Sequence, residues 1–291
     1  MSLLEDYYYP IDKIGSGSFG EVYMVQNKKG KIYAAKVEEK KTASILYEEY
    51  LIYKKLRENG VKFGIPKTYK FIQTPKVNFM TMELLGKSLD ELFIKNKKSF
   101  DVGTVLKIGI DIVSLLESVH NAGFIHRDIK PNNFLVGYAE KDDRIYITDF
   151  GLSKQYIVKE QHIDIRNERK LVGTARYASV SVHMGIEPSR RDDLESVGYM
   201  LVYFLKGSLP WQGLKKIPNK DQIKLIGEKK MYTSLNKLCE GLPGCFIEYI
   251  KYCKQLGFEE LPNYDFLRSL FIDTATRSKI ELKYFWTNPG N

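Results

Sequence analysis

The stretch His126-Arg127-Asp128-Ile129-Lys130-Pro131-Asn132-Asn133, followed by Asp149-Phe150-Gly151, decides how this chain of 291 residues is interpreted. Asp128 and Asn133 are five residues apart, so one short loop can direct both side chains at the same phosphate group. Asp149 arrives from a separate turn, after an apolar segment at 145–147. One carboxylate that takes a hydroxyl proton, with a carboxamide and a second carboxylate that hold magnesium, is typical of phosphoryl transfer. An isolated HRD triplet can be an ordinary surface turn, but HRD-x-K-x-x-N followed by DFG is far more specific.

Composition excludes several other classes of protein. With 43% hydrophobic and 28% charged residues, the chain has ordinary globular composition and can bury one or two cores. Its longest apolar run, near 197–205, is shorter than the roughly 18 residues that a membrane span needs. The N-terminus carries Glu5 and Asp6 and no basic region before an apolar core. We therefore expect neither a membrane span nor a signal peptide.

The formal net charge of +9 predicts either a solvated lysine surface or attraction to an acidic partner. No RNA-binding or zinc-finger pattern occurs, so acidic or phosphorylated proteins are the expected partners and nucleic acid is not. Cys239, Cys245 and Cys253 are odd in number and form no C-x-x-C pair. They are expected to be reduced structural thiols of the cytosol or nucleus, not zinc ligands or disulfides.

Hydrophobic periodicity divides the chain near residue 86. Before it, Asn27-Lys28-Lys29-Gly30 predicts the bend of a hairpin, and 44–58 predicts a helix with Ile45, Glu49, Ile52 and Leu56 on one stripe. After it the pattern is helical, with long helices predicted at 102–120 and, buried on all sides, at 194–205. A β-rich part with one main helix therefore precedes a larger, mostly helical part.

The pattern Gly15-x-Gly17-x-x-Gly20 alone is a weak signal, because dinucleotide folds and plain turns share it. Residues 22–25 continue as a strand, which favours a glycine flap over phosphates. Lys36 lies in an apolar strand and needs a carboxylate partner. Glu49 shares the apolar stripe of the next helix, whereas Glu48 is rotated by roughly 100°. Glu49 is the expected partner and Glu48 the alternative.

Residues 80–86 predict a strand that ends in a hinge. Backbone groups of Glu83, Leu84 and Leu85 would bind the adenine edge of a nucleotide. Met82 would close the back of that site, with Ala34 above and Leu135 below the ring. Each of these apolar residues could equally be plain core.

Across nearly its whole length the chain resembles the eukaryotic protein kinases, and more closely the casein kinase I group. The catalytic loop Asp128 to Leu135 carries this resemblance, together with Gly173-Thr174-Ala175-Arg176-Tyr177-Ala178-Ser179 and the segments 189–196 and 207–215. Most kinases carry Ala-Pro-Glu after the activation segment. Here Ala178-Ser179-Val180-Ser181 stands in its place, as is typical of casein kinase I.

The resemblance implies an α+β, bilobal protein-kinase fold in a single domain, 1–291, with an N-lobe at 1–82, a hinge at 83–86 and a C-lobe at 87–291. It implies serine/threonine transfer from ATP with Mg²⁺ onto acidic or pre-phosphorylated proteins. We further expect a monomer that is located in the cytoplasm or the nucleus. The expected catalytic residues are Asp128, Lys130, Asn133, Lys36 and Glu49. Asn133 and Asp149 are the expected metal ligands. Nucleotide contacts are expected from Ile14, Gly15, Gly17, Gly20, Val22, Ala34, Lys36, Met82, Glu83, Leu84, Leu85, Leu135, Thr148 and Asp149.

Two supporting roles are also expected. Thr174 would hydrogen-bond near Asp128 and Lys130 and help to dock the acceptor. Asp193, at the start of the buried helix, would accept backbone hydrogen bonds from the catalytic loop.

Three positions depart from the family. Asn132 replaces a usual Asp at a non-catalytic position, and Thr148 replaces a usual aliphatic residue before the DFG triplet. The segment Pro218-Asn219-Lys220-Asp221-Gln222 stands where relatives carry a denser basic stretch linked to phosphate binding and nuclear import. Both of those properties are thereby put in question.

The activation segment suggests where a substrate anion would bind. Between Lys154 and Val172 the only hydroxyl belongs to Tyr156, so little there can be phosphorylated. Four cationic side chains are nonetheless expected to converge beneath the activation segment without carboxylate partners. Such a cluster typically binds a phosphate or another anion. They are Arg127, Lys154, Arg169 and Arg176.

Two other functions compete with this interpretation. A pseudokinase would keep the fold without chemistry, but such proteins commonly lose Lys36, Asp128, Asn133 or Asp149, and all four are present. Small-molecule kinases share the loop chemistry but should lack the docking segment at 173–181. Transfer from ATP to casein, compared with transfer to small alcohols, distinguishes the three.

Overall fold

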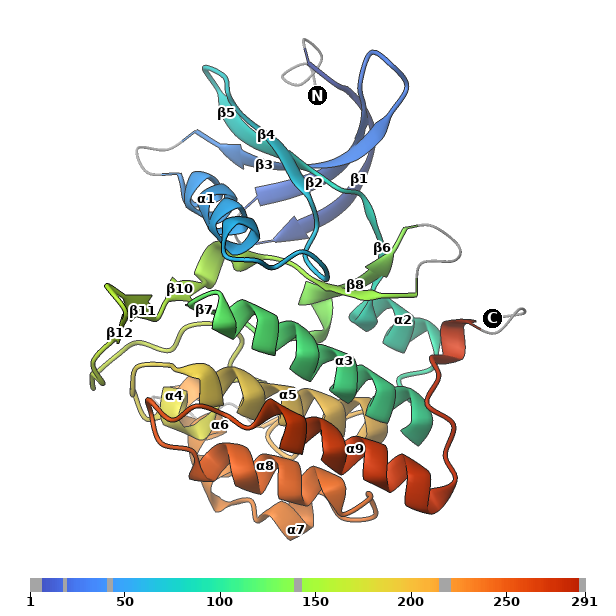
Figure 1. Ribbon diagram of the computed structural model, residues 1–291, viewed down its shortest axis with the longest axis vertical. Coiled ribbons are helices and arrows are strands. Elements are labelled where there is room, and N and C mark those ends of the chain that lie inside the picture. Colours follow the sequence, from blue (N-terminus) through green and yellow to red (C-terminus); the bar gives the residue numbers. More distant parts are fainter. Residues whose placement is uncertain (1–6, 18–19, 41–43, 139–142, 215–220, 288–291) are drawn as a thin grey trace. The chain divides into compact units, whose positions relative to one another are not determined.

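The computed structural model describes residues 7–17, 20–40, 44–138, 143–214 and 221–287 (Figure 1). The chain forms two compact units, one of Met1–Lys87 with Leu135–Ser153, the other of Ser88–Phe134 with Lys154–Asn291. Strands dominate the first unit and helices the second, which confirms the predicted α+β class. The first unit takes its last residues, Leu135–Ser153, from far along the chain.

The first unit is built on a five-stranded antiparallel sheet with the strand order β1-β2-β3-β5-β4. Its elements are β1 (Tyr9–Gly17), β2 (Gly20–Gln26), β3 (Ile32–Glu39), α1 (Ile45–Glu58), β4 (Thr68–Gln73) and β5 (Val77–Met82). A second sheet, β6-β8-β9, is formed by β6 (Leu85–Ser88), β8 (Phe134–Gly137) and β9 (Ile145–Ile147). The short 3-10 helix η2 (Phe150–Leu152) follows and packs against α1.

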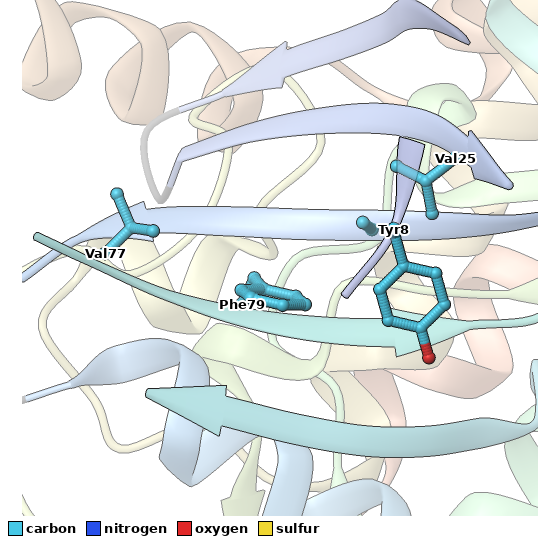
Figure 2. Packing of buried hydrophobic residues seen from close by; sticks show 5 residues of the cluster. Tyr8, Val25, Val77 and Phe79 are labelled. Atoms are coloured by element: carbon cyan, nitrogen blue, oxygen red, sulfur yellow. The ribbon is translucent and has the colours of Figure 1, made fainter. Parts of the chain in front are cut away.

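The two faces of the large sheet have different compositions, because side chains alternate along each strand. One face carries an apolar cluster in which Tyr8, Val25, Val77 and Phe79 are buried (Figure 2). Tyr8 approaches Phe79 edge to face, with ring centroids 6.2 Å apart. This cluster fixes the sheet from one side, so the opposite face is available to position polar side chains.

Helix α1 is anchored at its N-terminus by two side chains. The Ser44 hydroxyl accepts a hydrogen bond from Tyr47 N at 3.0 Å and caps the helix. The buried Glu38 carboxylate accepts hydrogen bonds from Ser44 Oγ (2.6 Å) and Ile45 N (3.0 Å). The inward stripe is Leu46, Glu49, Tyr53 and Leu56. The stripe predicted to begin at Ile45 is therefore wrong by one position at its start, since Ile45 is exposed.

The second unit consists mainly of helices. They are α2 (Leu89–Lys95), α3 (Val102–Asn121), α4 (Val180–His183), α5 (Arg190–Lys206), α6 (Gln222–Tyr232), α7 (Leu235–Leu238), α8 (Cys245–Gln255) and α9 (Tyr264–Ser278). Short strands and 3-10 turns connect them: β7 (Phe124–Ile125), η1 (Pro131–Asn133), β10 (Lys154–Gln155), β11 (Ile157–Val158), β12 (Gln161–His162) and η3 (Phe285–Thr287).

Helix α5 lies at the centre of this unit, and α3 and α8 pack against it while α9 packs against both of those helices (Figure 1). Residues 192–204 of α5 are buried without a break, as its sequence predicted. The three cysteines are buried free thiols. Among the described residues, no helix has the length and apolarity to cross a membrane.

Candidate active site

The first unit joins Lys36 of β3 to two carboxylates. Lys36 Nζ lies 2.6 Å from Glu49 Oε2 on α1 and 2.8 Å from Asp149 Oδ1, directly before η2. Glu49 is the partner that helix periodicity predicted, and the alternative, Glu48, is exposed. The three residues are brought together by the packing of α1 against both the sheet and η2.

Burial and charge act in opposite directions on this group. Burial would lower the pKa of Lys36, but Glu49 and Asp149 outweigh it and raise the pKa. Burial raises the pKa of Glu49, which is 1% exposed, and the Lys36 ammonium opposes that shift. Lys36 is therefore a fixed positive charge at any working pH. It lies beside an Asp149 carboxylate that remains 26% exposed.

Asp149 is held in an unusual backbone conformation. Its φ of 67° lies in the left-handed region, which a non-glycine residue adopts at some cost. The backbone N–H of Asp149 donates to Tyr53 Oη at 3.2 Å, and the Phe150 ring meets the Tyr53 ring edge to face with centroids 5.0 Å apart. Helix α1 thus supports the conformation that presents the Asp149 carboxylate to Lys36.

Strand register places several predicted nucleotide contacts on the same sheet face as Lys36. Val22 lies across from Lys36, and Ala34 lies across from Met82. Directly opposed residues of antiparallel strands share a face, so these side chains lie opposite the cluster of Figure 2. Gly20, at φ +134°, lies so close to β3 that a Cβ there would be 2.0 Å from Val37 O. Only glycine fits that approach.

In the second unit, Asp128 is surrounded by three predicted partners. Lys130 Nζ donates to Asp128 Oδ2 (2.6 Å) and Thr174 Oγ1 donates to Asp128 Oδ1 (2.8 Å). Asn133 Nδ2 donates to Asp128 O (2.8 Å). A Cβ on Gly173 would lie 2.3 Å from Arg127 O, so glycine permits the close approach of the two loops. The predicted contact between Thr174 and Asp128 is confirmed.

Asp193, at the start of α5, anchors the catalytic loop. Its carboxylate accepts hydrogen bonds from His126 N (2.7 Å) and Arg127 N (2.8 Å), as predicted. These bonds hold Arg127 at a φ of 68°, a second left-handed non-glycine residue. Burial raises the pKa of Asp193, but the hydrogen bond and charge of His120 outweigh it and lower the pKa.

Sequence reasoning missed two residues that support Asp193. His120, the penultimate residue of α3, lies with Nε2 3.0 Å from Asp193 Oδ2 and with Nδ1 2.8 Å from Tyr264 Oη on α9. Both ring nitrogens are therefore used inside the buried core. A histidine at a helix end carries no sequence signal of such a role, because its partners lie 73 and 144 residues away.

The expected group of unpaired cations has an internal counter-charge. Lys154 Nζ lies 2.8 Å from Glu187 Oε1, and Arg169 Nε lies 3.2 Å from Glu187 Oε2. Glu187 is 1% exposed, and its charge raises the pKa of Arg127, which burial lowers. The expectation of an unpaired group is therefore wrong for Lys154 and Arg169, which share the Glu187 carboxylate. This buried carboxylate, from the segment after α4, is thus not left without a counter-charge.

Arg176, the fourth predicted cation, makes different contacts. Its guanidinium lies 5.7 Å from the Tyr177 ring centroid and 5.6 Å from that of Tyr203. The residue is exposed, and it forms no salt bridge with any carboxylate among the residues that the structure describes. Its Nη1 donates a long hydrogen bond to Tyr177 Oη (3.5 Å), and stacking on the aromatic faces leaves its other N–H groups available to an anion.

The structure therefore arranges the predicted residues in two sets, one in each unit. Lys36, Glu49 and Asp149 form the first, and Asp128, Lys130 and Asn133 form the second. The remaining first-unit candidates include the half-buried Leu135 and Thr148 and the exposed Ile14. Ser18 and Phe19 of the glycine segment lie outside the described residues, as do residues 215–220 and with them most of the thinned basic stretch.

The donor atoms at the two predicted metal ligands suit a hard divalent cation. Asp149 carries a partly exposed carboxylate, and Asn133, whose amide nitrogen donates to Asp128 O, carries a carboxamide oxygen. Oxygen ligands of this kind, with water and phosphate completing the shell, are what Mg²⁺ prefers. No cluster of three His, Cys, Asp or Glu side chains suited to a metal occurs within the described part of the chain.

Comparison with known protein families agrees with this geometry. The family model described as "Protein kinase domain" matches residues 8–256. The match covers both sets of site residues and the segment that carries Thr174 and Glu187.

Proposed function

The chain belongs to the protein kinase family, and on that premise we propose that it is a serine/threonine kinase of the casein kinase I type. Membership of the family means ATP-dependent phosphoryl transfer to protein substrates, with use of a divalent metal. The proposal adds the acceptor hydroxyl, the casein kinase I type and a preference for acidic or phosphate-primed proteins.

One observation supports Asp128 as the general base. The Asp128 carboxylate accepts the hydroxyl of Thr174 at 2.8 Å on one oxygen and Lys130 at 2.6 Å on the other. These two bonds orient the carboxylate that would take the proton of an acceptor hydroxyl. The quoted segments that resemble casein kinase I support the finer assignment.

In the proposed reaction, the two sets of residues have different roles. Lys36, oriented by Glu49, binds the α- and β-phosphates. The acceptor hydroxyl oxygen bonds to the γ-phosphorus, the bond from that phosphorus to the bridging oxygen breaks, and ADP leaves. The hydroxyl proton passes to Asp128, and Lys130 stabilises negative charge on the transferred phosphoryl group.

Arg176 is the proposed residue for acidic or phosphorylated substrates. Its exposed guanidinium is supported by two tyrosine rings, whereas Lys154 and Arg169 share the Glu187 carboxylate. A phosphoserine about three residues before the acceptor, the spacing that the resemblance implies, would bind there. Such charge-assisted hydrogen bonds contribute about 1.5–3 kcal/mol each before screening by salt.

The remaining assignments follow the same resemblance. Mg²⁺ is the proposed metal, held by Asp149 and Asn133. The proposed state is a monomer of the cytoplasm or nucleus, a reducing compartment that suits three buried free thiols.

The test compares kcat/KM for matched serine, threonine and tyrosine peptides, with and without a phosphoserine before the acceptor. Wild type is expected to use the serine and threonine peptides and to prefer the primed ones. Arg176→Ala should lower the primed-to-unprimed ratio, whereas Lys254→Ala, which removes an exposed charge on α8, should leave it unchanged. Equal primed-to-unprimed ratios in wild type and Arg176→Ala would contradict the assignment of Arg176 to the substrate anion. Absence of any peptide phosphorylation would favour a pseudokinase.

A further inference from the structure

Lys230 on α6 is a lysine buried to 1% exposure. Its Nζ donates a hydrogen bond to Ala175 O at 2.9 Å and a second, short one to Ala178 O. The same nitrogen lies 5.1 Å from the ring centroids of both Tyr199 and Trp211. Among the described residues no carboxylate forms a salt bridge with it, so carbonyl oxygens and aromatic faces stabilise the ammonium instead.

The two carbonyls belong to the segment directly after Thr174. One of the two carbonyls between them, Arg176 O, accepts a hydrogen bond from Trp211 Nε1 at 2.7 Å. Ala175 O also receives His183 Nε2 at 3.0 Å. Three side chains from outside the segment thus bind three of its carbonyls.

Within the segment, the backbone turns back on Thr174. Tyr177 N and Ala178 N both donate to Thr174 O, at 2.9 Å and 3.0 Å. By binding the carbonyls of Ala175 and Ala178, Lys230 fixes the peptide units that follow Thr174. Thr174 in turn donates to Asp128, the proposed base.

Burying the Lys230 ammonium costs free energy, which indicates that its hydrogen bonds to the two carbonyls contribute to function. Burial lowers its pKa to about 7, with Glu195 acting in the opposite direction. The titratable groups that face it are His183 from α4 and Glu195 and Tyr199 from α5. An apolar side chain would fill the same space without that penalty, but it could not bind two carbonyls.

We propose that Lys230 is a positioning residue for the protein acceptor: it holds the segment at 175–178 so that Thr174 keeps Asp128 oriented toward the acceptor hydroxyl. The inference deepens the proposed function and rests on it. Lys230 itself touches neither of the two sets of site residues described above. Its effect passes through the carbonyls of Ala175 and Ala178.

The experiment uses Lys230→Met, which keeps the length of the side chain and removes the ammonium. The control is Lys229→Met, an exposed lysine one position earlier on α6. For each full-length protein we would measure kcat and KM for a peptide acceptor, the Kd for ATP by titration, Tm, and amide hydrogen exchange at Tyr177 and Ala178. Trp211→Phe, which keeps a ring and loses the bond to Arg176 O, tests the same segment independently.

We expect Lys230→Met to lower kcat/KM for the acceptor about 10- to 100-fold, the effect of a small misplacement of reacting groups. The Kd for ATP should stay within about twofold of wild type, and exchange at Tyr177 and Ala178 should accelerate. Lys229→Met should change none of these, and Trp211→Phe should show a smaller loss of the same kind. If Lys230→Met does not fold, Trp211→Phe decides the matter by the same readouts.

Unchanged acceptor kcat/KM in a folded variant, or a parallel loss of ATP affinity, would overturn the inference. Inactive wild-type protein would instead contradict the proposed function. The exchange rates at Tyr177 and Ala178 still report on Lys230 in that case, and unchanged rates would overturn the inference by themselves.

Discussion

Thr174 Oγ1 donates a hydrogen bond to Asp128 Oδ1 across 2.8 Å, although 46 residues separate the two in sequence. The bond joins the catalytic loop to the segment expected to dock the acceptor, and both lie in the second unit. This bond orients the carboxylate of Asp128, the proposed base, although Thr174 itself takes no part in the proposed chemistry.

Thr174→Ala should therefore lower kcat/KM for a peptide acceptor about 10- to 100-fold, since the base loses one of its orienting bonds. Thr174→Ser keeps the hydroxyl and should retain most of the activity. Steady-state kinetics on the two purified variants, with Tm as the control for folding, checks this. Equal activity of the alanine and serine variants would show that the bond has no positioning role.

Lys36→Met and Asp149→Asn should each lower kcat/KM about 10²- to 10⁴-fold, because both remove charge that acts on phosphate or metal. Circular dichroism should show that both proteins remain folded. Lys36→Met should also lower Tm, because it leaves the buried Glu49 carboxylate without its partner. Retention of more than about a tenth of wild-type kcat/KM would contradict the role assigned to that residue.

Met82→Ala should admit ATP analogues enlarged at the adenine, improving their kcat/KM at least about tenfold. Met82 is 8% exposed and lies across from Ala34, on the sheet face that carries Lys36. Met200→Ala removes the same volume from α5 in the other unit and should have no such effect. If analogue use is unchanged by Met82→Ala and Met82→Gly, Met82 is plain core.

Glu38→Ala should destabilise α1 by about 1–3 kcal/mol, since it removes a buried acceptor of two backbone N–H groups and the Ser44 hydroxyl. Activity should fall as well, because α1 carries Glu49. Glu39→Ala, at an exposed position next in sequence, is the control. The free energy of unfolding from chemical denaturation and the kinetic constants are compared for both variants. Equal free energies of unfolding would show that Glu38 does not stabilise α1.

Acid should destabilise the protein in part through His183. Burial and then the nearby charge of Lys230 lower the pKa of His183 to about 4, whereas the unfolded chain has its ordinary value near 6.5. The unfolded state therefore binds the proton first, and the stability present above pH 6.5 is lost as pH falls toward 4. His183→Gln can still donate to Ala175 O but cannot take up a proton.

Thermal melts of wild type and His183→Gln between about pH 7.5 and about pH 4.5 test this. The Tm of wild type should fall faster with acid than that of the variant. Parallel curves would mean that His183 does not contribute to the acid sensitivity.

Local periodicity was enough to predict one of these contacts. The choice of Glu49 over Glu48 followed from helical rotation alone. It succeeded because Lys36 and Glu49 both lie on regular elements whose side-chain directions are fixed by the backbone.

Other contacts could not be predicted because they depend on packing between distant elements. Glu187 gave no sign that it would face Lys154 and Arg169, which led to the wrong expectation of an unpaired cation site. Lys230 belongs to a lysine pair that resembles any solvated helix face, and only the fold brings it under Ala175 and Ala178. His120 was hidden for the same reason.

The composition of the first unit has a consequence for the newly made chain. Lys36 and α1 emerge from the ribosome early, but the unit is complete only when the 66 residues that follow Lys87, up to Ser153, have been added. At typical synthesis rates that interval lasts roughly 3 to 13 s. During it Tyr53 on the buried face of α1 has no Phe150 to pack against, and Lys36 lacks its second carboxylate, Asp149. The first unit therefore cannot complete its own packing until the segment Leu135–Ser153 has been synthesised.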